Sequence, residues 1–123
     1  MAKFVTKADQ QWASARLGGF NVDECPLWQG KDSPYSGLFR LPKGFQFPHH
    51  KHGRWVQILV LGGKIRVEVD GLEPKTMAAG EYYFVEPGDP HVETVVEDLT
   101  AFVVTAENRE ALYESFGPRG GNP

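Results

Sequence analysis

From residue 36 onward, apolar and polar side chains alternate along short segments that are separated by turn residues. The segment Lys64–Val69 alternates most regularly, which is typical of a β-strand with one face toward a core and the other toward solvent. Gly62–Gly63 precedes this segment and predicts a hairpin that joins it to an apolar strand over residues 55–61. Because such segments recur with turns about every eight to twelve residues, the pattern predicts an all-β barrel or sandwich.

The two ends of the chain do not follow this alternation. In the N-terminal part, large apolar residues such as Trp12 and Trp28 are irregularly spaced among polar and turn residues. Near the C-terminus, Thr105 is placed to cap a helix that Gly117 would end. We therefore expect an N-terminal arm, a barrel, a C-terminal helix and a flexible tail, over residues 1–35, 36–105, 106–117 and 118–123, respectively.

Composition and charge limit the partners and the cellular location that we expect for the protein. The chain has 123 residues, enough to bury a core without disulfides, and its single cysteine, Cys25, cannot form an internal one. A formal net charge of -3 argues against nucleic-acid binding, and no apolar run is long enough to cross a membrane. We expect a cytoplasmic protein that binds a small-molecule substrate, with no nucleic-acid partner and no membrane contact.

The two tryptophans of the N-terminal arm need burial, because apolar area stabilises a protein by about 25 cal/mol for each Å² removed from water. The arm either wraps the barrel of its own chain or crosses to a second subunit. We therefore expect a homodimer in which the arm takes part.

Histidine is concentrated in one segment, since His49, His50 and His52 are three of the four histidines in the chain. In an extended segment the side chains alternate between two faces, so His50 and His52 point the same way. The fourth, His91, follows the rigid segment Pro87–Pro90, which fixes its direction. Neutral imidazoles bind zinc, iron, nickel and copper, and convergent histidines predict a metal site. The alternative is a solvated basic loop and a histidine in a turn.

Gln57 would add a fourth, uncharged donor to this set. A divalent ion held by His50, His52, Gln57 and His91 would keep its full double charge, which favours an anionic ligand such as a carboxylate, enolate or enediolate. The same two-residue period gives Trp55, Gln57 and Leu59 one shared face. We therefore expect Trp55 and Leu59, together with Phe47, to line the substrate pocket.

Two further residues are candidates for proton transfer. Glu93 shares a strand face with His91 and would act as a general base or as a carboxylate that supports a metal ligand. Tyr83 lies in a β-rich run before the turn and is the alternative group for moving the proton. For Glu93, a surface glutamate is an equally good interpretation.

These segments resemble the two conserved motifs of the cupin superfamily. The first motif is Gly, five residues, His, one residue, His, three or four residues, Glu, about six residues and Gly; it is matched by Gly44, His50, His52 and the turn at Gly62–Gly63, with Gln57 in place of Glu. The second motif has its core at Pro87, Gly88 and His91. The resemblance implies a double-stranded β-helix, or jelly-roll barrel. It also implies that the three histidines bind a metal, with Gln57 in the position of the Glu ligand.

The resemblance does not select a reaction, because the superfamily contains dioxygenases, isomerases, cyclases and binding modules. Our first hypothesis is an iron-dependent dioxygenase acting on a small anionic or enolisable substrate, with manganese, nickel or zinc as alternative metals. The second is a redox-neutral isomerase or cyclase acting on a keto-sugar or a polyketide-like molecule. The third is a module that binds a small molecule without turnover.

Overall fold

The computed structural model describes residues 2–17, 19–31 and 34–114. The predicted tail at 118–123 and the predicted end of the helix at Gly117 lie outside these residues. The elements are η1 (Lys7–Asp9), β1 (Ala13–Leu17), β2 (Phe20–Gln29), β3 (Tyr35–Leu41), β4 (Gln46–His50), β5 (Val56–Val69), β6 (Lys75–Ala78), β7 (Tyr82–Val85), β8 (His91–Thr105) and α1 (Arg109–Glu114).

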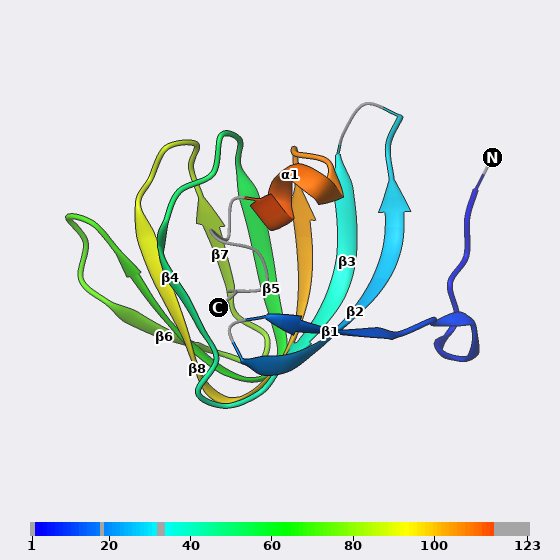
Figure 1. Cartoon of the computed structure of the whole chain (residues 1–123), viewed down its shortest axis with the longest axis horizontal. Coiled ribbons are helices and arrows are strands. Elements are labelled where there is room, and N and C mark those ends of the chain that lie inside the picture. Colours follow the sequence, from blue (N-terminus) through cyan, green and yellow to red (C-terminus); the bar gives the residue numbers. More distant parts are fainter. Residues whose placement is uncertain (1, 18, 32–33, 115–123) are drawn as a thin grey trace.

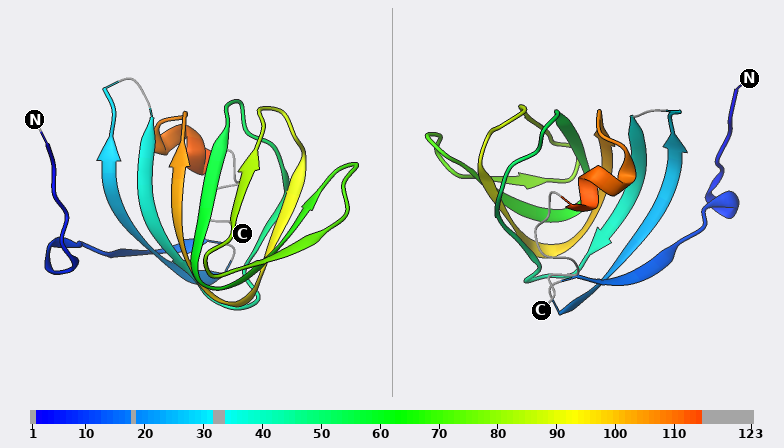
Figure 2. Two further views of the ribbon diagram at one scale, coloured as in Figure 1. Left: turned by 180° about the vertical axis from the view of Figure 1, so that it is seen from behind. Right: turned by 45° about the horizontal axis from the view of Figure 1, so that its top comes forward.

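The strands form one antiparallel sheet in the order β1-β2-β3-β8-β5-β6, while β4 pairs with β8 and β7 pairs with β5. The sheet curls into a barrel, and α1 lies across one of its openings (Figures 1 and 2). The predicted all-β jelly roll is confirmed. Among the described residues, no helix is long and apolar enough to cross a membrane.

The long strand β5 corrects one local prediction. Gly62–Gly63 does not form a hairpin, because β5 continues through it from Val56 to Val69 and pairs with β8 on both sides of it. The pairing is only irregular there, and Gly63 has φ +81°. A Cβ atom at Gly63 would lie 2.0 Å from the carbonyl oxygen of Asp98, so the close approach of two backbones requires glycine. The hairpin in this region instead joins β5 to β6, after Asp70.

Alternation along β5 determines what the barrel encloses. Val56, Ile58 and Val60 are buried in the core, as are Ile65 and Val67 after the irregularity. Burying an aliphatic side chain of this size stabilises the fold by about 1.5–3 kcal/mol. The first half of β5 therefore presents an aliphatic inner wall, and the residues between these positions face outward.

Helix α1 begins at Arg109 rather than at residue 106. Thr105 stays in β8, and the side-chain oxygen of Asn108 accepts the backbone N–H of Ala111 at 2.8 Å, which is an N-cap contact. Leu112 on this helix is buried in the core. The helix therefore closes the barrel through an apolar contact and starts at a capping residue that the sequence analysis did not select.

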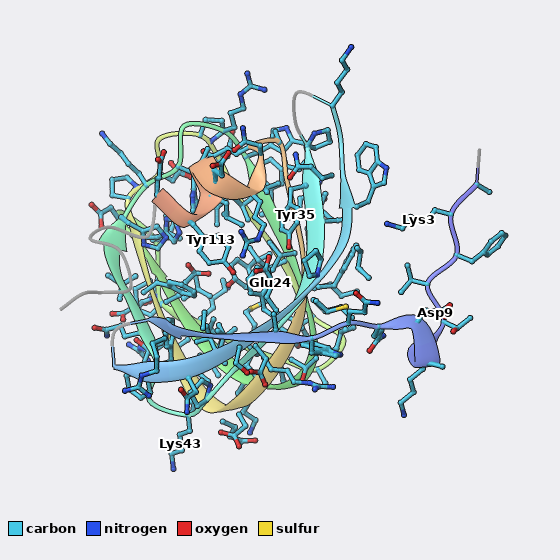
Figure 3. The ribbon with its side chains drawn as sticks, turned by 45° about the vertical axis from the view of Figure 1, so that its right-hand side comes forward. Lys3, Asp9, Glu24, Tyr35, Lys43 and Tyr113 are labelled. Atoms are coloured by element: carbon cyan, nitrogen blue, oxygen red, sulfur yellow. The ribbon has the colours of Figure 1, made fainter. Side chains whose placement is uncertain are left out.

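A buried carboxylate, Glu24 on β2, attaches α1 to the barrel (Figure 3). It accepts hydrogen bonds from the hydroxyl groups of Tyr35 and of Tyr113, the latter at 2.6 Å, and from the guanidinium group of Arg109 at 2.6–3.0 Å. Burial raises the pKa of the Glu24 carboxyl, but Arg109, Tyr113 and Tyr35 outweigh it and lower the pKa below its ordinary value. Glu24 is thus an ionised anchor for the helix.

The N-terminal segment has two parts. β1 and β2 belong to the barrel sheet, and the ring of Trp12 lies 3.8 Å from the guanidinium carbon of Arg40 on β3. Before η1, the chain extends away from the barrel, and Phe4 is 83% exposed (Figure 1). The ammonium group of Lys3 still donates a hydrogen bond to the carbonyl oxygen of Leu27 at 2.7 Å.

Candidate metal centre

Pairing of β4 with β8 brings the distant histidines together. His50 and His91 are opposite each other in the register of this pair, and their ring centroids are 4.1 Å apart. His52 follows in the connection to β5, with its ring 4.9 Å from that of His50 and 5.2 Å from that of His91. One nitrogen from each ring lies within 4.8 Å of the other two. The three histidines thus form a buried group that could hold a metal ion.

The connection after His52 is held by backbone and side-chain contacts. The carbonyl oxygen of His52 accepts the N–H of Gly88 at 2.9 Å. Oε1 of the buried Glu107 accepts the backbone N–H groups of Gly53 and Arg54 at 2.9 and 3.2 Å. The segment that follows β8 therefore fixes the position of the loop that carries one of the three histidines.

The backbone also orients the ring of His91. Nδ1 lies 2.9 Å from the carbonyl oxygen of Asp89, which requires this nitrogen to carry a proton. In the neutral ring, the lone pair is then on Nε2, the nitrogen that faces into the site. This orientation by a backbone carbonyl is the usual support of a metal-binding histidine.

The pKa values of His52 and His91 are shifted in opposite directions. Burial is the largest effect at His52 and lowers its pKa to about 4, so this imidazole is neutral and able to bind a metal at neutral pH. Burial also acts to lower the pKa of His91, but the nearby carboxylate of Glu93 outweighs it and raises this pKa. Glu93 is therefore the dominant charge at the site.

Glu93 is buried two residues after His91 on the same face of β8. Its Oε1 lies 3.4 Å from Nε2 of His91 and 3.6 Å from Nε2 of His50, while its Oε2 accepts the hydroxyl hydrogen bond of Tyr83. Burial raises the pKa of Glu93, but His91, His50 and Tyr83 together lower it to about 2. The pKa of Tyr83 is raised by burial and by the neighbouring carboxylate. The site thus contains a carboxylate with a phenol on its far oxygen.

His52, His91 and Glu93 open onto an apolar cavity inside the barrel. Phe47 and Tyr83, which the sequence singled out, lie in its wall together with Leu112 of α1. The remaining lining is almost entirely aliphatic and aromatic: Phe39, Leu41, Val56, Ile58, Ile65, Val85, Leu99, Ala101 and Val103. A few polar groups in an apolar cavity are typical of a small-molecule site.

Three predicted site residues do not reach this cavity, and we correct their assignment. Gln57 lies between the inward-facing Val56 and Ile58, and its amide oxygen accepts a hydrogen bond from the hydroxyl of Tyr82 at 2.8 Å on the outer side. Trp55 and Leu59 share that outer side. The sequence pattern correctly gave all three the same face, but it was the wrong face. Inward-facing His50 and His52 are followed in the same phase by Val56 and Ile58, whereas the prediction assumed a shift of one residue at the turn.

Fold and site together define a small single-barrel cupin with a three-histidine group. The ChrR cupin-like domain family matches residues 2–109, and the chain belongs to this family. The membership confirms the resemblance that the two histidine motifs indicated. Comparison of the sequence with curated proteins gives no match.

Several solved structures share the fold. An RmlC-like cupin from Shewanella frigidimarina is 20% identical, with 91% of this chain and 96% of that chain covered and a TM-score of 0.74. KdgF from Halomonas sp. is 18% identical, with 88% and 98% covered and a TM-score of 0.70. The polyketide cyclase RemF from Streptomyces resistomycificus is 23% identical, with 86% and 79% covered and a TM-score of 0.68. At these identities, the likeness shows the fold alone.

Proposed function

We propose that this protein binds a divalent transition metal, iron first, at His50, His52 and His91, and catalyses the dioxygenation of a small anionic or enolisable substrate. The observation that carries the proposal is a group of three buried imidazoles, two of which, His52 and His91, lie in the wall of an apolar cavity. Histidine nitrogens suit iron as well as manganese, nickel and zinc, so the donor set fits the ion. When bound, such a metal would hold an oxygen anion of the substrate and supply the redox chemistry.

The cavity supports the part of the reaction that the protein itself performs. Its apolar wall excludes water and would hold the hydrocarbon part of a substrate next to the histidines. In a dioxygenation, both atoms of O₂ enter the products, so no external reductant is needed. An enolisable substrate would enter as its anion, because the positive charge of the site favours that form.

One observation favours a second candidate function. The hydroxyl of Tyr83 and the carboxylate of Glu93 form a hydrogen-bonded pair in the cavity wall. Such a pair could move a proton on a keto compound without any redox step, as an isomerase or a cyclase requires. The polyketide cyclase among the structures that share the fold is compatible with this candidate.

The first test is the metal content of protein purified without an affinity tag, combined with oxygen-electrode measurements on β-diketones, catechols and keto acids. We expect iron and oxygen uptake that depends on substrate, and the loss of both in His91→Ala. Metal without oxygen uptake for any compound would favour the isomerase or cyclase. If the protein took up no metal even after incubation with Fe²⁺, both the dioxygenase and the isomerase or cyclase hypotheses would be contradicted. The remaining hypothesis would be a module that binds a small molecule without turnover.

A further inference from the structure

The inner face of β5 provides no metal ligand. In the first cupin motif, three or four residues separate the second histidine from the Glu, which corresponds to residue 56 or 57 here. Val56 faces the cavity with a hydrocarbon side chain, and Gln57 faces outward, where it is hydrogen-bonded to Tyr82. A carboxylate for the three-histidine group would therefore have to come from another strand.

Glu93 on β8 places a carboxylate oxygen at the required spacing. Metal–ligand bonds of about 2.1 Å at tetrahedral angles separate neighbouring donor atoms by about 3.4 Å. Oε1 of Glu93 is 3.4 Å from Nε2 of His91 and 3.6 Å from Nε2 of His50. These distances are too long for hydrogen bonds of ordinary strength, and they match two ligand atoms on either side of a shared ion.

The orientation of the His91 ring also supports a cation between His91 and Glu93. Nδ1 of His91 carries the proton that is directed to Asp89, so in the neutral ring a lone pair on Nε2 faces the negative oxygen of Glu93. Within the described part of the chain, this buried Nε2 has no hydrogen-bond partner. A lone pair that faces a carboxylate is repulsive unless a cation lies between them. Either a metal ion or an additional proton on His91 satisfies this requirement.

Tyr83 completes the arrangement. Its hydroxyl group donates to Oε2 of Glu93, which leaves Oε1 directed at the histidines. A hydrogen bond to the non-binding oxygen is the usual way in which a protein orients a carboxylate that binds through one oxygen only. The two oxygens of Glu93 thus have separate tasks.

We propose that Glu93 is the fourth protein ligand of the metal, supplied from β8, where it replaces the carboxylate that β5 lacks. This inference rests on the proposed function in that a metal must bind at the three histidines. It also changes the charge of the occupied site from two positive units to one. The ligand class it predicts is a small monoanion with an apolar body, because the single remaining charge is neutralised by one anionic group.

The test measures affinity for Zn²⁺ by competition with a chelator and records the visible absorption of the Co²⁺-loaded protein, which reports the donor set. Three variants address the site: Glu93→Gln, Tyr83→Phe and His50→Ala. Two controls match them: Glu97→Gln alters a glutamate on the same strand whose partner is the exposed Lys64, and Gln57→Ala removes the ligand that the motif spacing suggested. Thermal unfolding of each metal-free variant verifies that it is folded.

We expect Glu93→Gln to weaken Zn²⁺ binding by more than about 100-fold, beyond the roughly 10–100-fold typical of a residue that only supports a ligand. Tyr83→Phe should fall within that smaller range, and both controls should bind as the wild type does. The Co²⁺ spectrum should change in Glu93→Gln and stay the same in the controls.

Two results separate this inference from the proposed function. If the wild type binds metal, His50→Ala does not, and Glu93→Gln binds as tightly as the wild type or more tightly, then Glu93 is only the ion-pair partner of a protonated histidine and the inference is wrong. If the wild type binds neither Zn²⁺ nor Co²⁺, the proposed function itself fails.

Discussion

Replacing Glu24 with glutamine would test the contact that holds α1 over the cavity. The side chain of Glu24 is 7% exposed, and it accepts hydrogen bonds from Tyr35, Tyr113 and Arg109. Hydrogen bonds to a charged group contribute about 1.5–3 kcal/mol each to stability. The side chain of Arg109 is 46% exposed, so solvent screening reduces its share to about 1 kcal/mol or less.

Glu24→Gln keeps one acceptor oxygen and turns the other position into a donor. One tyrosine hydroxyl then loses its acceptor, the other loses the charge of its acceptor, and the guanidinium of Arg109 loses its counter-ion. We expect the free energy of unfolding to fall by about 3 kcal/mol, a large part of the roughly 5–15 kcal/mol of a typical domain. With a urea m-value of about 2 kcal/mol per M, the midpoint would fall by about 1.5 M.

The effect should depend on pH in a defined direction. Because the folded-state pKa of Glu24 is lower than its ordinary value of 4.5, the ionised group stabilises the fold above that value, and this stability is lost as the pH falls through the folded-state pKa. The difference between wild type and variant should therefore be constant from pH 7 to about 5 and shrink in more acidic urea titrations.

A neighbouring substitution provides the control. Asp23→Asn, on the same strand, alters the acceptor of an exposed hydrogen bond from Ser14 and should change stability by about 0.5 kcal/mol or less. If Glu24→Gln were no more destabilising than Asp23→Asn, or if its effect did not change with pH, the anchoring role of the ionised carboxylate would be refuted.

Three further predictions concern the site and its surroundings. Glu107→Ala removes the acceptor of the Gly53 and Arg54 N–H groups, so we expect Zn²⁺ affinity to fall by roughly 10–100-fold in chelator competition, whereas unchanged affinity would show that the loop keeps its shape unaided. The metal-free protein should lose up to about 3 kcal/mol of stability between pH 6.5 and 4, because unfolded His52 takes up a proton that the folded residue resists, and the loss should be smaller in His52→Gln; an equal loss in both would be inconsistent with this origin. We propose that the N-terminal arm, where Phe4 and Trp28 are 83% and 50% exposed, takes part in a homodimer, so Trp28→Glu should be monomeric by light scattering where the wild type is dimeric; a monomeric wild type would contradict the dimer, and a dimeric variant would locate its interface elsewhere.

Local sequence patterns were sufficient for the fold class and for the three histidines. Alternation marks strands directly, and the i, i+2 spacing of His50 and His52 places both rings on one face whatever the partner strand is. The turn signal at Gly62–Gly63 was misleading, because β5 pairs with β8 across it and long-range pairing outweighs a local preference. Local propensity therefore predicted which strands and helix exist more accurately than it predicted the residues at which they begin and end.

The contacts between distant segments were not readable from the sequence. Tyr83 and Glu93 meet only because β7 and β8 both pair with β5, and Glu24 meets α1 only because β2 joins the sheet. Nothing in the sequence around Glu24 or Glu107 distinguishes them from surface glutamates. Only a weak signal was available. Glu24 is a carboxylate in the middle of a strand, and Glu107 is one shortly before a helix.

The misplaced face of Gln57 has the greatest consequence for function. The phase of alternation is unchanged across the turn, because Val56 and Ile58 face inward as His50 and His52 do. The prediction assumed a shift of one residue there, and such a shift exchanges the inner and outer faces of the next strand. With Val56 and Ile58 inside, the first half of β5 contributes only hydrocarbon to the cavity. The polar groups of its lining are His52 after β4, His91 and Glu93 on β8, and the facing Tyr83. A bound molecule would then meet the charged groups with one end and an aliphatic wall with the other. This polarity favours an anionic head on an apolar body, and it argues against a sugar with hydroxyl groups on every side, which would leave those hydroxyls without partners.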